Sequence, residues 1–119
     1  MNKNILIAGS TGAIGSEFIR FYSDDPNVEK IVSLSRKKIE PTHNKIQSIE
    51  LDYSNEQSFE NLNKISQLES LSTIIIATGI LHTDQIKPEK SIDEINSKVL
   101  EKVFQVNVYG PILLVKKLL

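Results

Sequence analysis

The sequence contains no cysteine, only two histidines, and no excess of charge of either sign. Without thiols the chain cannot form disulfides or thiolate metal sites, and His43 and His82 lie far apart, so no metal centre is predicted. With 14 basic and 15 acidic residues the net charge is −1, which argues against a surface that coats nucleic acid. No apolar run approaches the roughly 20 residues of a membrane helix, and none suits a signal peptide. The sequence therefore predicts a cytoplasmic protein with neither nucleic-acid nor membrane partners.

The length and composition are those of a small globular protein. The chain has 119 residues, of which 39% are hydrophobic and 24% charged. This length suits one domain and is too short for two of ordinary size.

Four short apolar runs, each bounded by polar or turn residues, predict β-strands. The first and fourth runs are unbroken, which predicts strands buried on both faces, whereas the third alternates only weakly and predicts an exposed strand. The runs span residues 4–8, 28–34, 46–51 and 73–77.

Three segments with apolar residues at helical spacing predict helices. The first helix begins after Gly12, and the others begin at Ser-x-x-Gln and Ser-x-x-Glu capping boxes on Ser54 and Ser91. Their apolar positions are Ile14, Phe18, Phe21 and Tyr22 in the first helix, Phe59, Leu62, Ile65 and Leu68 in the second, and Ile95, Val99, Val103 and Val106 in the third.

This order of elements predicts the first half of a doubly wound parallel α/β sheet of the Rossmann type, with strand order 3-2-1-4. A complete sheet of this type would continue with further strands, whereas the sequence stops at Leu119 within an apolar helical stretch. We therefore interpret residues 1–119 as a truncated domain. An unpaired edge on the fourth strand and an apolar last helix predict self-association into a homo-oligomer.

A glycine-rich loop lies between the first strand and the first helix. Gly9 permits a tight turn out of the strand, Gly12 lets the backbone approach a pyrophosphate, and Gly15 permits close packing of the helix on the sheet. The free N–H groups and the dipole of the helix would then face the phosphates. An ordinary glycine-rich turn is the alternative, but the position within a β-α-β pattern favours dinucleotide binding. The candidate residues here are Gly9, Ser10, Thr11, Gly12, Ile14 and Gly15.

The residues after the second strand bear on the choice of cofactor. An NAD site usually carries an acidic residue there, whereas this chain has Ser35 and Arg36, followed by Lys37 and Lys38. A hydroxyl and a guanidinium would bind a 2′-phosphate through charge-assisted hydrogen bonds. We therefore expect NADP(H) in preference to NAD(H), with Ser35 and Arg36 as the main contacts. A solvated basic loop is the alternative interpretation.

With the glycine loop, the pair Asp52-Tyr53, the triplet 77–79 and Asn107 all in order, the chain resembles the short-chain dehydrogenase/reductase family over its whole length. Residues 79–82 and 107–111 are most similar to the C-factor type of that family. The resemblance implies that Asp52 accepts a hydrogen bond from the adenine amino group and that Tyr53 covers the adenine ring. It also implies that the triplet passes close to the cofactor ribose, although Ala77 and Thr78, which precede Gly79, depart from the usual Asn-Ala.

Asn107 is a candidate for a kink in the last helix. Pro111, four residues later, has no N–H to donate to the Asn107 carbonyl, and Gly110 further loosens the helix. We expect a bend with a carbonyl free to hold a water. By the family resemblance this asparagine links a catalytic lysine to a proton-relay water, while a kink without a function is the alternative.

The acid-base pair of the family is missing from the sequence. In the family a Tyr acts as general acid with a Lys four residues later, but Tyr22, Tyr53 and Tyr109 are followed at that spacing by Pro, Gln and Leu. His82 could contact a substrate but is more simply interpreted as an exposed loop residue.

From the cofactor motifs and the missing acid-base pair, we interpret the chain as the nucleotide-binding half of an NADP(H)-dependent oxidoreductase that is inactive by itself. A carbonyl or alcohol substrate would bind only to a full-length form. A non-catalytic dinucleotide-sensing or interaction module is the alternative.

Overall fold

A parallel four-stranded sheet forms the centre of the protein in a computed structural model, which describes residues 2–65, 68–80, 83 and 85–119. The strands are β1 (Lys3–Ala8), β2 (Val28–Ser35), β3 (Ile46–Glu50) and β4 (Leu71–Ile76). Their spatial order is β3-β2-β1-β4, which confirms the predicted order 3-2-1-4. Ile5 pairs with Ile31 of β2 and Leu6 with Ile74 of β4, so β1 lies in the middle of the sheet.

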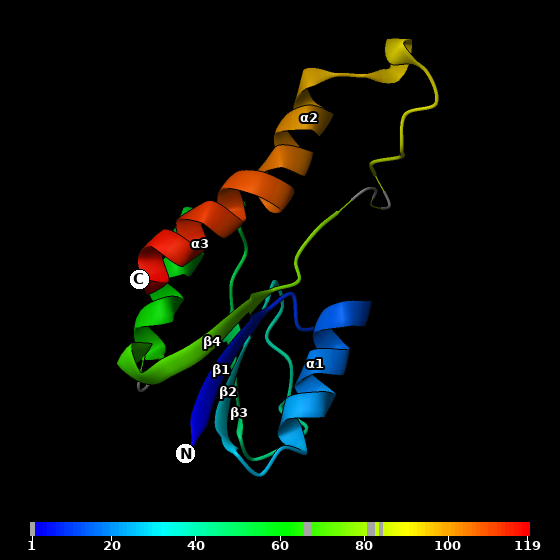
Figure 1. The fold of residues 1–119 in the computed structure, drawn as a ribbon. Helices are drawn as coiled ribbons and strands as arrows, with labels where there is room; N and C mark the ends of the chain where they lie inside the picture. The colour runs from blue at the N-terminus through cyan, green and yellow to red at the C-terminus, as the bar shows by residue number, and fades with distance from the viewer. Residues whose placement is uncertain (1, 66–67, 81–82, 84) are drawn as a thin grey trace.

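Helices cover both faces of this sheet (Figure 1). Helix α1 (Ala13–Ser23) lies on one face, where its side chains pack against Ile5 and Ile7. The 3₁₀ helix η1 (Glu56–Lys64) and helix α3 (Gly110–Leu118) lie on the other. Because alternate residues of a strand point to opposite faces, each strand contributes to both layers of the core.

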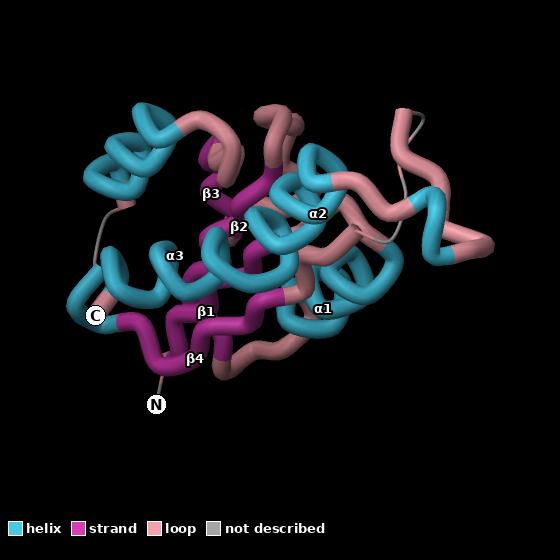
Figure 2. Tube along the Cα trace, turned by 90° about the horizontal axis from the view of Figure 1, so that it is seen from above, coloured by secondary structure: helices cyan, strands magenta, loops and turns pink. Residues whose placement is uncertain are grey.

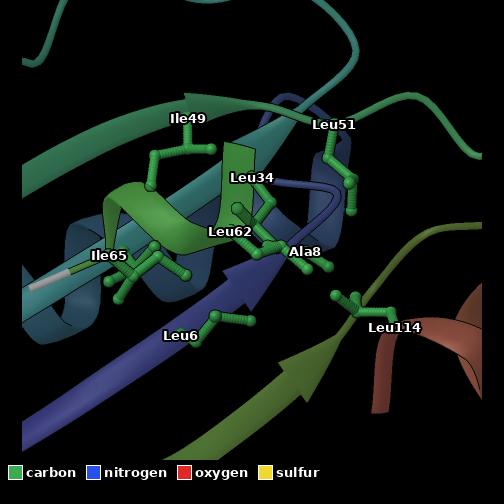
Figure 3. Close-up of a cluster of buried hydrophobic side chains, with 9 residues drawn as sticks. Leu6, Ala8, Leu34, Ile49, Leu51, Leu62, Ile65 and Leu114 are labelled. Atoms are coloured by element: carbon green, nitrogen blue, oxygen red, sulfur yellow. The ribbon is translucent and has the colours of Figure 1, made fainter. Parts of the chain in front are cut away.

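The larger cluster of the core lies under η1 and α3 (Figure 3). Leu6 and Ala8 of β1 meet Leu62 of η1 and Leu114 of α3 there, and all four are at most 1% exposed. The first strand is therefore buried on both faces, as its unbroken apolar run predicts.

The prediction that β4 is also buried on both faces is wrong. Its residues are only partly buried apart from the exposed Ser72, because among the described strands β4 pairs with β1 alone and forms an edge of the sheet. The prediction of an exposed third strand also fails at Ile49, which is 4% exposed and belongs to the core.

The predicted buried face of α1 is correct for Phe18 and Tyr22 and wrong for Ile14 and Phe21. Ile14 and Phe21 are both 67% exposed, whereas Phe18, Ile19 and Tyr22 pack against the sheet. Gly15 is the buried residue of α1 and packs closely against the turn at Gly9. The residues on the same side of the helix, three, four and seven positions after Gly15, therefore face inward.

The second predicted helix is a 3₁₀ helix, and its N-cap is Asn55 rather than Ser54. The Asn55 side chain accepts a hydrogen bond from the Gln57 N–H at 3.1 Å. The apolar residues of this segment recur at intervals of three, which matches the three residues per turn of a 3₁₀ helix better than the 3.6 of an α-helix.

The third predicted helix begins later than expected. The capping box at Ser91 is present, with its N–H donating to Glu94 at 3.0 Å, but it opens only the 3₁₀ turn η3 (Ile92–Glu94). Helix α2 (Ser97–Phe104) starts after a second cap on Asn96. The segment 85–96 before it, which contains η3, projects away from the sheet (Figures 1 and 2). Within the described residues no helix is both long and apolar enough to cross a membrane.

Candidate functional site

A cleft of about 200 Å³ opens at the carboxyl ends of the strands. Parallel sheets of this type bind ligands at this edge. Ten of the residues predicted from the sequence line the cleft: Gly9, Thr11, Gly12, Ser35, Arg36, Asp52, Tyr53, Ala77, Thr78 and Gly79. The structure therefore brings together residues from segments that lie up to 70 positions apart in the chain.

The turn after β1 is fixed by backbone contacts. Gly9 has φ +81°, and a Cβ atom there would lie 2.7 Å from the carbonyl carbon of Ala77, so only glycine fits. The N–H groups of Gly9 and Ser10 both donate to the carbonyl of Leu34, at 3.0 and 3.3 Å. The Ser10 side chain is buried and accepts a hydrogen bond from the Ser33 hydroxyl at 2.7 Å, so it ties the turn to β2 and is not among the residues that line the cleft.

The N-terminus of α1 opens onto the cleft. Gly12 is the N-cap of α1 and has no side chain that could cap the helix. The first turn contains no acidic residue. The first N–H groups of a helix have no partner within the helix, and the helix dipole adds a partial positive charge there. This end of α1 can therefore accept an anion. Gly15 is buried behind it against Gly9, and Ile14 is exposed and does not line the cleft.

Asp52 is the acidic residue of the cleft among those described. Burial alone would raise its pKa, but Ser54 donates to the Oδ1 atom from its N–H at 2.9 Å and from its hydroxyl at 2.6 Å. With the positive charges of Lys102 and Arg36, these bonds hold the pKa of Asp52 below its usual range. The carboxylate is therefore ionised near neutral pH, with Oδ2 available to accept a further hydrogen bond.

Ser35 and Arg36 sit at the end of β2. The Ser35 side chain is buried and its hydroxyl donates to the Lys37 carbonyl at 2.6 Å, so its remaining capacity is that of an acceptor. Arg36 is exposed at the cleft, whereas Lys37 does not line it.

Tyr53 is held on three sides. Its hydroxyl lies 3.1 Å from the hydroxyl of Thr78, and its carbonyl accepts a hydrogen bond from Gln105 at 3.2 Å. A Cβ at Gly110 would lie 2.4 Å from the Tyr53 ring, so the start of α3 packs directly on it. Burial raises the pKa of Tyr53, and the contact with Thr78 opposes this effect only partly.

Asn107 does not line the cleft, but it fixes the segment that follows Gly79. Its side-chain oxygen accepts from the Ile80 N–H and its side-chain nitrogen donates to the Ile80 carbonyl, both at 2.7 Å. Asn107 lies in η4 (Gln105–Tyr109), a π-helical turn, so the predicted irregularity of the helix is present. The side-chain pair with Ile80 was not predicted, because sequence reasoning considered only the carbonyl.

Sequence reasoning also missed Lys102 and Val106, which line the cleft from the last helical stretch. Val106 belongs to the apolar face predicted for that helix, but no role in the site was predicted for it. Lys102 precedes Val103 of that face, and a lysine at such an edge can lay its alkyl stem along buried surface. His82 lies outside the described residues. The described part of the chain contains no group of three or more His, Asp or Glu residues that could hold a metal ion.

Solved structures with the same fold include several oxidoreductases. A short-chain dehydrogenase family protein from Francisella tularensis superposes with a TM-score of 0.78 at 21% identity, over 99% of this chain and 46% of its own. A carbonyl reductase from Pseudomonas aeruginosa gives 0.78 at 17% identity, over 98% and 55%. A short-chain dehydrogenase from Leptospira borgpetersenii, solved with bound NAD⁺, gives 0.71 at 24% identity, over 99% and 45%.

No protein-family model and no curated protein matches the sequence. The chain spans about half the length of the solved structures named above. At these identities the similarity shows the fold, and the chain therefore has the Rossmann-type α/β fold on which these oxidoreductases are built.

Proposed function

We propose that this chain is the dinucleotide-binding part of an NADP(H)-dependent short-chain oxidoreductase that acts on a carbonyl or alcohol. The observation that carries the proposal is the shared cleft: an uncapped helix N-terminus, a glycine turn, a cation and a hydrogen-bonding carboxylate all open onto it. Anion-binding and base-binding groups at this edge of a parallel sheet fit a dinucleotide.

Each part of the ligand has a matching group in the cleft. The pyrophosphate would lie against Thr11 and Gly12 at the start of α1, where backbone N–H groups are available. The adenine amino group would donate to Asp52, and the ribose would pass the backbone of Ala77 and Gly79. When bound, the nicotinamide supplies or accepts a hydride.

Asn107 is proposed to act through the backbone. Its paired hydrogen bonds with Ile80 hold the segment after β4 against η4, and they thereby fix the wall of the cleft beside Gly79. The sequence offers no Tyr with a Lys four residues later, so we propose that this chain binds the dinucleotide without transferring a hydride by itself.

The alternative, a non-catalytic module that senses a dinucleotide, is favoured by one observation. The Thr78 hydroxyl forms a hydrogen bond with the Tyr53 hydroxyl, so this bond uses part of its capacity to contact a substrate or cofactor. The two functions separate in a longer form of the protein: an oxidoreductase oxidises NADPH in the presence of an aldehyde or ketone, and a sensing module binds NADPH without turnover.

Arg36→Ala is expected to weaken NADPH binding about tenfold and to change NADH binding less than about twofold, because only NADPH carries a phosphate for the guanidinium to bind. Calorimetric titration with both nucleotides measures the two affinities. Arg20→Ala is the matched control, since Arg20 lies on α1, pairs with Glu17 and does not line the cleft. Equal losses for both nucleotides, or a wild-type preference for NADH, would contradict the NADP(H) assignment.

Gly12→Ala tests the phosphate site separately. The new Cβ would meet only the Gly9 carbonyl oxygen, at 3.5 Å, so the free energy of unfolding should fall by no more than about 1 kcal/mol. The methyl group would nevertheless keep a pyrophosphate from the backbone, and we expect the affinities for NADPH and NADH to fall together by about tenfold or more. Undiminished binding by a folded variant would place the phosphates elsewhere.

A further inference from the structure

Lys102 is set apart from the other lysines of the same helical stretch. Lys98, Lys116 and Lys117 are exposed, whereas Lys102 is half-buried and lines the cleft together with Val106, one turn further along. Its side chain thus borders the site, and its positive charge acts on Asp52.

The position of Lys102 changes the net charge of the residues that line the cleft. The charged lining residues among those described are Arg36, Asp52 and Lys102. Arg36 and Asp52 alone would cancel, and the ionised carboxylate would repel a phosphate nearby. Lys102 gives the described lining a net positive charge.

The two cations come from separate elements. Arg36 follows β2, whereas Lys102 belongs to α2. Asp52, after β3, interacts electrostatically with both of them. A phosphate beside Arg36 would therefore share the cleft with a second cation from a different element.

We propose that Lys102 is a specificity-determining residue that offsets the charge of Asp52 and so favours a dinucleotide with a 2′-phosphate. This inference rests on the proposed function and extends it by naming a second cation on which the preference for NADP(H) depends. The carboxylate can then serve the adenine amino group without excluding the phosphorylated ribose.

The test compares Lys102→Gln with Lys98→Gln, the same substitution one turn away at an exposed position. Calorimetric titrations with NADPH and NADH at one fixed, low salt concentration give the affinities. We expect Lys102→Gln to weaken NADPH binding about fivefold to tenfold and NADH binding less than about twofold. Lys98→Gln should match the wild type, and Lys102→Arg, which keeps the charge, should retain the preference.

The outcomes distinguish failure of the proposed function from failure of the role assigned to Lys102. If the wild type binds neither nucleotide, the proposed function fails and this inference fails with it. If the wild type binds NADPH and Lys102→Gln behaves as Lys98→Gln does, only the role of Lys102 is overturned. An equal loss for NADPH and NADH in a variant that melts like the wild type would also overturn it, since it would show a general contribution to binding.

Discussion

Gly15→Ala is expected to lower the free energy of unfolding by about 3 kcal/mol. The new Cβ would lie 1.9 Å from the carbonyl oxygen of Gly9 and 2.7 Å from its carbonyl carbon. Both are backbone atoms of a turn that hydrogen bonds tie to β2, so neither can move aside easily. Alanine improves helix propensity by about 1 kcal/mol over glycine, which is too little to offset such a clash.

Denaturant unfolding followed by circular dichroism measures the effect, and Gly12→Ala is its control. Both variants add one methyl group near the turn at Gly9, but the one at Gly12 makes only an ordinary contact with the Gly9 carbonyl oxygen, at 3.5 Å. A loss of stability at Gly15 no larger than at Gly12 would show that α1 can shift away from the turn. In that case the close approach would not be what positions the helix N-terminus at the cleft.

The parts of the fold that could be predicted from the sequence are those with local causes. The strand order follows from four apolar runs and their connections. The glycine turn follows from a residue type that alone tolerates its backbone angle and its approach to Ala77. The residues gathered in the cleft follow strand ends, which parallel strands bring to one edge.

The features that could not be predicted depend on partners distant in the sequence. The bonds between Asn107 and Ile80 arise only once η4 lies beside the segment that follows β4. Lys102 likewise lines the cleft with residues distant from it in the sequence. The inward face of α1 was predicted only in part: Phe18 and Tyr22 pack on the sheet as expected, but the apolar stripe alone does not reveal that the helix is closest to the core at Gly15, which turns Ile14 and Phe21 outward.

Leu114→Ala is expected to cost about 3 kcal/mol of stability, whereas Leu113→Ala should cost less than about 1 kcal/mol. The two leucines are neighbours on α3, but Leu114 is 0% exposed within the larger core cluster and Leu113 is 46% exposed. Removing the buried side chain leaves a cavity between α3 and the sheet, while removing the exposed one leaves none. Denaturant unfolding of both variants compares them directly.

The Leu114 variant also connects the core to the cleft. Asn107 lies two helical turns before Leu114, on the same continuous helical stretch, and its bonds to Ile80 require that stretch to stay docked. We therefore expect Leu114→Ala to bind NADPH more weakly than Leu113→Ala does. The measurement is made without denaturant, at a temperature at which Leu114→Ala remains folded. Unchanged binding with reduced stability would show that α3 stabilises the domain without positioning the wall of the cleft beside Gly79.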